Sequence, residues 1–309
     1  MGGARTVVMI RPHHFHVNPQ TLSDNAFQSA DDVTASEVSR RARDEVDQAA
    51  FVLRRHGVEV ELFDDDRVDR PDAVFPNNWF STHADGKLVL YPMHAPNRRS
   101  ERRADVIEHL RHEFEVSELV DLTAAEDEGR ALEGTGAIVF DHSTRIAFMA
   151  RSQRTDDGLF EQVCDLLGYR PHRFDTADSE GLPVYHTNVL LSIGESFAVL
   201  CPELLPHHDE RGRLREALET QERTVIDLDV AQIGDFAANI LELDAPSGPI
   251  IAMSTRAHTA LTRDQRRALE KGAKLVRLDI PTIERAGGSV RCMLAEIRLG
   301  RRDALPAVS

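Results

Sequence analysis

Short apolar runs alternate with longer amphipathic segments along most of the chain, and this alternation predicts an α/β fold. The first apolar run, residues 6–10, has the length of a buried strand. Residues 33–56 carry apolar positions at helical spacing and end at a glycine, as helices often do. With a further strand expected over residues 58–63, the chain opens as a strand, a helix and a strand.

Four later units repeat a longer version of this order, in which two apolar runs around a turn precede a helix. The paired runs are expected at residues 73–91, 132–150, 186–200 and 236–253, and the helices at residues 100–114, up to 168, near 214–220 and at 263–272. Five ββαβ-like units at intervals of roughly 50 to 60 residues predict radial repetition with pseudo-fivefold symmetry, in a single domain over residues 1–309. The first unit lacks one strand, which the apolar run at residues 289–298 can supply.

The composition is that of an ordinary globular protein, with 41% hydrophobic and 29% charged residues. A net charge of −15 repels nucleic-acid phosphates and anionic lipid, so a small-molecule partner is expected instead of nucleic acid or a membrane. The sequence shows no apolar signal core and no run of roughly 18 apolar residues, and a cytoplasmic protein is therefore expected. A homodimer is compatible with the sequence, which does not fix the oligomeric state.

Three cysteines, Cys164, Cys201 and Cys292, are an odd number at unrelated spacings. They predict neither a disulfide framework nor a zinc site, and they favour a reducing compartment. Cys292 follows the flexible segment 286–289 and precedes an apolar run, which places its thiol at the entrance of a strand. A thiol there can act as a nucleophile if a histidine takes its proton. The alternative, a small buried hydrophobic residue, suits Cys164 and Cys201 better.

Polar residues stand at the same point of three other units, where an inner strand is expected to begin. His186 precedes one apolar run, Glu133 precedes another, and Asn77 and Asn78 head a third. Any one of them alone is more often structural. If the units surround one axis, however, all of them converge there with Cys292, and a cysteine, a histidine and a carboxylate together form a catalytic group.

Six segments in the same order resemble the guanidine-modifying superfamily, which contains arginine deiminases, dimethylarginine hydrolases, succinylarginine dihydrolases and amidinotransferases. They are residues 95–99, 132–136, 152–155, 185–188, 235–239 and 287–292. The chain looks closest to the dimethylarginine hydrolases and to amidinotransferase-like proteins implicated in citrulline use. The resemblance implies a five-bladed α/β propeller, the pentein fold, without cofactor or metal. It also implies that Cys292 is the nucleophile, that His186 carries protons and that Glu133 orients the substrate.

The same resemblance implies which residues contact the substrate. Two arginine segments that hold a substrate carboxylate in dimethylarginine hydrolases correspond to Arg154 and to either Arg98 or Arg99. Asn239 matches a strand entrance of the family, and Asn188 follows the catalytic histidine. A free amino acid is therefore expected as the substrate, since bidentate arginine pairing suits an α-carboxylate.

The segment 75–79 departs from the family pattern. Enzymes that act on a cationic guanidinium usually present one or two carboxylates there, whereas this chain has Asn77 and Asn78, and Asn188 stands where arginine deiminases tend to have aspartate. Amides suit a neutral ureido group, which has both donors and an acceptor. Hydrolysis of citrulline to ornithine, ammonia and carbon dioxide is therefore expected. An arginine deiminase, a dimethylarginine-type hydrolase and an amidinotransferase are the alternatives.

The histidine-rich segment 12–16 does not predict a metal site, because adjacent loop histidines lack fixed ligand geometry. It reads as a rim loop in which Asn18, Asn25 and Gln28 are candidate substrate contacts. A non-catalytic ligand-binding protein or a ribosome-associated scaffold is the alternative from another class. The joint presence of Cys292, His186 and Glu133 favours the enzyme, since a binding protein does not need all three.

Overall fold

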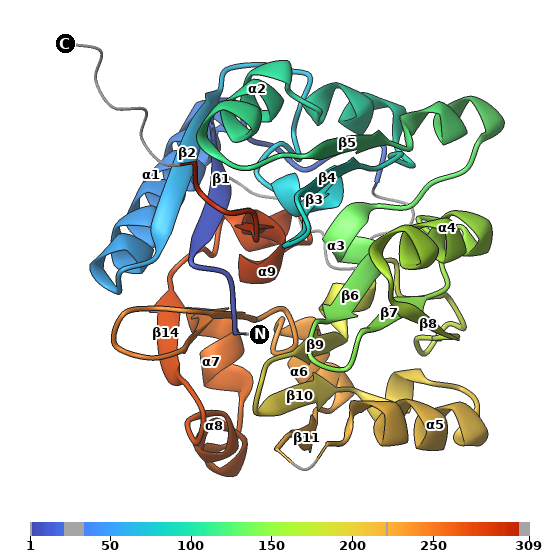
Figure 1. The fold of residues 1–309 in the computed structure, drawn as a ribbon. Helices are drawn as coiled ribbons and strands as arrows, with labels where there is room; N and C mark the ends of the chain where they lie inside the picture. Colours follow the sequence, from blue (N-terminus) through green and yellow to red (C-terminus); the bar gives the residue numbers. More distant parts are fainter. Residues whose placement is uncertain (1, 22–33, 221, 303–309) are drawn as a thin grey trace.

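Five three-stranded sheets make up the β-structure of the computed structural model, which describes residues 2–21, 34–220 and 222–302 (Figure 1). The strands are β1 (Thr6–Pro12), β2 (Glu59–Asp65), β3 (Phe80–Thr82), β4 (Lys87–Leu90), β5 (Glu118–Asp121), β6 (Ile138–Asp141), β7 (Ile146–Ala150), β8 (Arg170–Phe174), β9 (Leu191–Ile193), β10 (Phe197–Leu200), β11 (Thr224–Asp227), β12 (Leu241–Leu243), β13 (Ile250–Ser254), β14 (Lys274–Leu278) and β15 (Ala295–Ile297). The expected α/β class is thus confirmed as a mixed fold of small sheets.

Helices and short helical turns connect these strands. The α-helices are α1 (Ala35–Arg55), α2 (Ala104–Glu113), α3 (Gly134–Ala137), α4 (Asp157–Leu167), α5 (His208–Leu218), α6 (Val230–Gly234), α7 (Thr255–Ala260), α8 (Arg263–Leu269) and α9 (Val290–Met293). The 3-10 turns are η1 (Pro76–Asn78), η2 (Pro96–Glu101), η3 (Thr123–Glu128), η4 (Thr187–Val189), η5 (Pro202–Leu204) and η6 (Ile283–Arg285). No helix among the described residues is long and apolar enough to cross a membrane.

All five sheets follow one pairing rule. The middle strand is antiparallel to one neighbour and parallel to the other, as in β3-β4-β5 and β6-β7-β8. The first sheet obeys the same rule only because β15, from the end of the chain, pairs antiparallel with β1. The prediction that a late strand completes the first unit is therefore confirmed.

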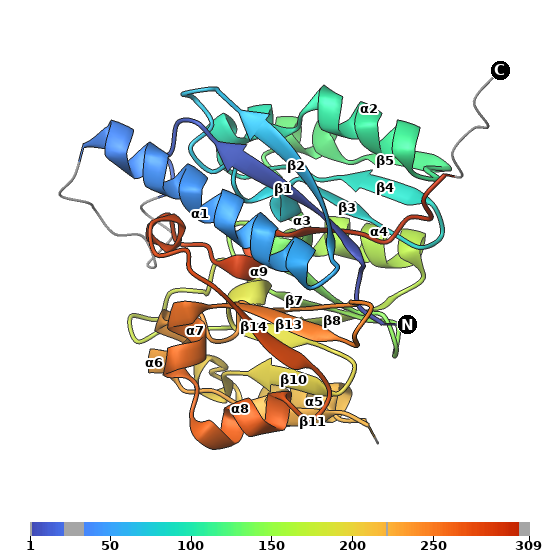
Figure 2. The same cartoon turned by 90° about the vertical axis from the view of Figure 1, so that its left-hand side faces the viewer.

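The sheets surround α3 and α9, while α1, α2, α4, α5 and α8 lie on the outside (Figure 1). The longest helix, α1, lies beside β1 and β2 in both views (Figures 1 and 2). Its start is fixed by Thr34, whose hydroxyl accepts the backbone N–H of Glu37. Val38, Ala42 and Val46 recur at four-residue intervals and are buried. This apolar face covers the first sheet.

We call β3, β6, β9, β12 and β15 the inner strands, and three of them begin later than the sequence predicts. Strands are predicted to start at residues 132, 186 and 289, but a short helical turn comes first in each place, as α3, η4 or α9. Gly134 shows one reason. Its φ is +45°, and a Cβ there would lie 2.5 Å from the carbonyl oxygen of Asn77. The chain can approach η1 this closely only with glycine, and it turns before it becomes a strand.

Helix boundaries also differ in places. The helix expected near residues 214–220 begins six residues earlier, at His208, because polar residues of its first turn lie exposed and leave no apolar signal. The short helices α6 and α7 are missing from the prediction altogether. Both begin at capping side chains, Asp229 and Ser254, rather than at an apolar period.

Candidate functional site

The thiol of Cys292 lies on α9, in a cavity at the centre of the five sheets. We call this the catalytic cavity, and it is lined by Asp72, Phe75, Asn78, Arg98, Arg154, Tyr185, His186, Ala286, Gly287, Gly288 and Cys292. The Cys292 side chain is buried and lines this space. Cys164 and Cys201 are buried in hydrophobic clusters instead, and burial raises the pKa of their thiols to about 12 and about 11.

Two side-chain amides hold the sulfur of Cys292. The Nδ2 of Asn239 lies 3.3 Å from Sγ, and the Nδ2 of Asn188 lies 3.5 Å away. The same Asn239 amide also donates to the backbone carbonyl of Asn188, at 3.1 Å. Both residues are expected from the sequence to bind substrate, and the structure places their amides against the sulfur of Cys292. The Oδ1 of Asn188 lies 3.9 Å from the same sulfur, so the thiol is surrounded by polar amide groups.

His186 and Glu133 form a buried pair beside the thiol. The ring Nε2 of His186 lies 2.7 Å from Oε2 of Glu133, and the other carboxylate oxygen accepts the backbone N–H of His94 at 3.0 Å. Burial lowers the pKa of His186, although the hydrogen bond to Glu133 opposes that shift. A neutral ring that donates from Nε2 to the carboxylate keeps Nδ1 as a proton acceptor.

The Glu133 carboxylate is stabilised in its charged form. Burial alone would raise its pKa, but the charge of Arg154 and the hydrogen bond from His186 outweigh burial and hold that pKa well below its usual range. The distance from Nη1 to Oε2 of Glu133 is 3.5 Å for Arg154 and 3.7 Å for Arg98. Glu133 is therefore an anion that can orient His186 and stabilise its protonated form during a reaction.

The two arginine segments place different residues at the cavity. Arg98 is buried, donates to Oδ1 of Asn78 at 2.9 Å and pairs with Glu101 at 2.8 Å. Arg154 lines the wall, with its guanidinium 4.7 Å from the ring centre of Tyr185. Arg99, by contrast, lies outside the cavity, half-buried against a carboxylate at 3.4 Å. Of the two neighbouring arginines, only Arg98 lines the catalytic cavity.

Asp72 is a cavity residue that the sequence reasoning missed. It is buried, its Oδ2 accepts the side-chain amide of Asn18 at 2.7 Å, and it lies 3.6 Å from Nε of Arg98. Its Oδ1 has no hydrogen-bond partner among the described residues. The segment 75–79 itself offers amides, but Asp72, just before it, adds a carboxylate to the same cavity. The only signal was an acid three residues before Phe75, in a turn closed by a backbone hydrogen bond between the two.

The side chains of Asn77 and Asn78 lie in different places relative to the cavity. Asn78 lines the cavity, whereas Asn77 lies behind it and accepts the Asn78 amide on its Oδ1 at 3.1 Å. The Nδ2 of Asn77 is buried without a partner in the described part of the chain. Among the expected rim residues, Asn18 contacts Asp72 as above, while Asn25 and Gln28 lie outside the described residues.

The charges of the side chains around the cavity favour a bound cation. Arg98 and Arg154 are balanced by Glu133 and Asp72, and a third acid, Glu101, is buried against Arg98. Burial raises the pKa of Glu101 to about 7, so this carboxyl changes its protonation near neutral pH. At and above that pH these five described side chains carry three negative charges and two positive ones.

One group of potential metal ligands occurs among the described residues, away from this cavity. Asp175, His207 and Glu210 lie close together, but Asp175 already pairs with Arg151 at 3.1 Å and His207 is exposed. The catalytic cavity itself presents one thiol, one histidine and carboxylates that are engaged by arginine. These residues provide covalent and proton-transfer chemistry without requiring an ion.

Comparison with known proteins identifies the family. The family model described as "N,N dimethylarginine dimethylhydrolase, eukaryotic" matches residues 11–299. No curated protein matches by sequence. The N-terminal domain of ArgZ, a cyanobacterial arginine dihydrolase, bound to substrate, matches with a TM-score of 0.73 and 15% identity, over 94% of this chain and 97% of that one.

Two further solved structures have the same fold. The enzyme AgrE, in complex with ornithine and NAD⁺, matches with a TM-score of 0.74 and 17% identity, over 96% of this chain and 40% of that one. Dimethylarginine dimethylaminohydrolase (DDAH) from Pseudomonas aeruginosa, in complex with citrulline, matches with a TM-score of 0.65 and 13% identity, over 96% of this chain and all of that one. With a family model that spans most of the sequence, the chain belongs to the N,N-dimethylarginine dimethylhydrolase family of the guanidine-modifying superfamily, and it is a hydrolase of carbon–nitrogen bonds other than peptide bonds.

Proposed function

We propose that the protein hydrolyses the guanidino group of a free amino acid of the arginine type through a covalent intermediate on Cys292. The observation that carries this proposal is Oδ1 of Asp72, a buried carboxylate oxygen that borders the same cavity as the thiol and has no partner among the described residues. An N–H of either a guanidinium or a ureido group could satisfy it, but the guanidinium donor is charged, and charge-assisted hydrogen bonds to a carboxylate are the stronger ones. Because a buried carboxylate oxygen without a donor is costly, the cavity favours a cationic substrate over a neutral one.

The first half of the reaction forms the intermediate. The proton of the Cys292 thiol passes to His186, and the thiolate attacks the central guanidinium carbon to form a carbon–sulfur bond. The carbon–nitrogen bond to the terminal amine then breaks, and the amine leaves with the proton from His186. Glu133 stabilises the imidazolium that exists between these two transfers. The side-chain amides of Asn188 and Asn239 keep the sulfur in position to attack this carbon.

The second half releases the product. Water gives a proton to His186 and its oxygen bonds to the same carbon, after which the carbon–sulfur bond breaks and the thiolate is restored. With arginine the products are citrulline and ammonia. A methylated arginine would release the corresponding methylamine. In an amidinotransferase, an amine would take the place of this water.

The α-carboxylate is proposed to bind at Arg154. Its guanidinium lies on the cavity wall, packed on Tyr185. The Tyr185 hydroxyl in turn donates to the carbonyl of Gly287, in the segment that leads to Cys292. Arg98 is held by Glu101, Asp72 and Asn78, and its role is to order these groups.

Citrulline is the second candidate substrate, with ornithine, ammonia and carbon dioxide as products. The observation in its favour is the neutral amide of Asn78, which stands on the cavity wall where a second carboxylate would bind a guanidinium more strongly. Protonation of Glu101 near pH 7 removes one negative charge and reduces the preference for a cation.

Two inferences accompany this assignment. The five sheets are proposed to be the blades of a five-bladed propeller with pseudo-fivefold symmetry, since each has the same strand order and the catalytic residues precede its innermost strand. A cytoplasmic location is proposed because a nucleophilic thiol must stay reduced.

The test is to incubate the purified protein separately with arginine, dimethylarginine and citrulline, and to measure ammonia, methylamine, citrulline and ornithine. The Asp72→Asn variant should lower kcat/KM for a guanidino substrate by about 10- to 100-fold, since it replaces a charged hydrogen bond by a neutral one. Activity toward citrulline should change far less.

Asn78→Asp is the matched variant, because it adds the charge that Asp72→Asn removes. It should shift preference toward guanidino substrates. Turnover of citrulline alone by the unmodified protein, with no change of preference in either variant, would contradict the guanidino proposal and support the second candidate.

A further inference from the structure

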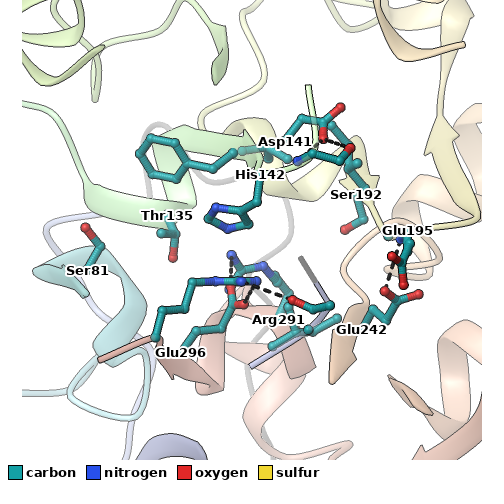
Figure 3. Close-up of a pocket in the computed structure, with 18 of the residues that line it drawn as sticks. Ser81, Thr135, Asp141, His142, Ser192, Glu195, Glu242, Arg291 and Glu296 are labelled. Carbon is teal, nitrogen blue, oxygen red and sulfur yellow. Dashed lines mark hydrogen bonds and ion pairs between the residues drawn. The ribbon is translucent and has the colours of Figure 1, made fainter. Parts of the chain in front are cut away.

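A second cavity extends along the innermost strands, beyond the catalytic residues (Figure 3). We call it the far cavity, and its wall comes from β3, β6, β9, β12 and β15 and the turns that follow them. Its volume is about 70 Å³. A single water needs roughly 10–15 Å³ by the same measure, so the space can hold several waters or one small ligand.

Two guanidinium groups in this wall share one carboxylate. The distance to the carboxylate of Glu296 is 3.1 Å from Nη2 of Arg291 and 2.7 Å from Nη2 of Arg298. The buried Nε of Arg298 has no hydrogen-bond partner among the described residues. Burial also lowers the pKa of Arg291, as expected for a cation that is incompletely compensated. This side of the cavity therefore carries one excess positive charge and an unused donor.

The rest of the lining holds one further guanidinium, that of Arg223, and three carboxylates, those of Asp141, Glu195 and Glu242, so the whole wall has four carboxylates against three guanidinium groups. The positive excess is therefore local to Arg291, Arg298 and Glu296. Arg223 and Asp141 form their own buried salt bridge, with Nη2 3.0 Å from Oδ1. Glu242 lies across the cavity beside Glu195, whose backbone N–H it accepts at 3.0 Å (Figure 3). Burial raises the pKa of Glu242, which weakens its repulsion of an anion.

His142 adds a donor opposite the arginines. Its ring points toward Arg291 in Figure 3, and its Nδ1 lies 2.6 Å from the hydroxyl of Tyr169. Burial lowers the pKa of His142 to about 3, so the ring is neutral at physiological pH. When the tyrosine hydroxyl donates to Nδ1, the ring proton lies on Nε2. His83, with a pKa lowered by burial to about 4, adds no charge of its own.

We propose that the far cavity binds a small monovalent oxyanion, bicarbonate or a short carboxylate, between Arg291, Arg298 and His142. One negative charge balances the excess positive charge. Arg291 and Arg298 both line this space, and guanidinium groups bind carboxylate-like anions through paired hydrogen bonds. Arg291 directly precedes Cys292, so both cavities share α9.

The test is calorimetric titration of the full chain with bicarbonate and, separately, with acetate, at constant ionic strength in a buffer without other oxyanions. Saturable one-to-one binding of at least one of the two is expected. Arg298→Gln should weaken it at least tenfold, and Arg298→Lys, which keeps the charge but not Nε, should weaken it less.

Two control variants separate this site from the others. Arg154→Gln, in the catalytic cavity, and Arg256→Gln, an exposed arginine paired with Asp235, should both leave the affinity unchanged. Binding of acetate alone would assign the site to carboxylates, and binding of bicarbonate alone would assign it to bicarbonate.

Absence of saturable binding to the unmodified protein would overturn the proposal, whatever the variants do. Binding that is lost in Arg154→Gln and kept in Arg298→Gln or Arg298→Lys would overturn it as well, since the anion would then occupy the catalytic cavity. No substrate is used, so the result is independent of the proposed hydrolysis.

Discussion

The catalytic cavity and the far cavity are built from the same five inner strands but use opposite ends of them. Asn78, Glu133, Asn188, Asn239 and Cys292 all stand just before an inner strand begins. Most far-cavity residues come from within those strands or after them, although Arg291 comes before one, next to Cys292. The turns before the strands bring the thiol, the histidine and the carboxylate together, whereas the far cavity is lined mainly by the strands themselves. One repeated framework therefore holds two different polar clusters.

Replacement of the nucleophile should have the largest effect. Cys292→Ser should reduce hydrolysis by at least about a thousandfold, because a serine hydroxyl is not activated by a histidine placed for a thiol. The measurement is ammonia release from the best substrate. Cys164→Ser is the matched control, since that thiol is buried in a hydrophobic cluster away from both cavities. Equal activity of Cys292→Ser and the unmodified protein would remove the catalytic role from this cavity.

The sequence predicts the position of the catalytic cavity well because the chain consists of repeated units. Apolar runs recur at a regular interval, and Cys292, His186 and Glu133 occupy the same point of three repeats. Asp72 was missed because it lies in a turn outside that point. The choice between Arg98 and Arg99 also could not be made, since it depends on which way a short 3-10 turn faces.

The residues of the far cavity are harder to predict from the sequence. Glu242 and Glu296 interrupt otherwise apolar strands, and a buried acid in such a strand requires a partner. The partner, however, can come from the neighbouring turn or a strand far away in the chain. Arg223 reaches Asp141 across 82 residues. Such pairs depend on how the sheets pack against each other. The spacing of apolar residues along the chain does not specify that packing.

The amides at the sulfur should give an intermediate effect. Asn239→Ala removes the donor 3.3 Å from Sγ and should slow alkylation of Cys292, because the thiolate loses a hydrogen bond. A loss of about 1–2 kcal/mol corresponds to roughly a 10-fold decrease in thiolate alkylation at neutral pH. The rate of alkylation by a haloacetamidine, measured against pH, reports this change directly.

A purely structural role for Asn239 would give a different result. The alkylation rate would then fall equally at all pH values, or the melting temperature would fall with no shift of the pH profile. Asn239→Asp is the informative companion, because it keeps the size but places a carboxylate beside the thiolate. It should slow alkylation at neutral pH further than alanine does, because the carboxylate repels the thiolate.

The smallest effect on catalysis is expected from His83, in the far cavity, where the change should appear in stability. His83 is buried beside Phe140, with its Nε2 2.7 Å from the hydroxyl of Ser81, and burial lowers its pKa to about 4. The unfolded chain therefore binds a proton before the folded chain does. Stability falls as the pH drops from about 6.5 to about 4, by up to about 3 kcal/mol from this residue.

His83→Phe keeps the aromatic contact with Phe140 and removes the titrating group. We expect the variant to lose less stability than the unmodified protein between pH 6.5 and pH 4, in urea unfolding measured at each pH, while kcat/KM at pH 7 stays within about twofold. His142 continues to titrate in the variant, so part of the acid sensitivity should remain. An unchanged pH dependence of stability would mean that His83 is not a neutral, buried ring. A large fall in kcat/KM would mean that the two cavities are coupled more closely than their separate ion pairs indicate, because the hydrogen bonds that His83 makes do not reach the catalytic cavity.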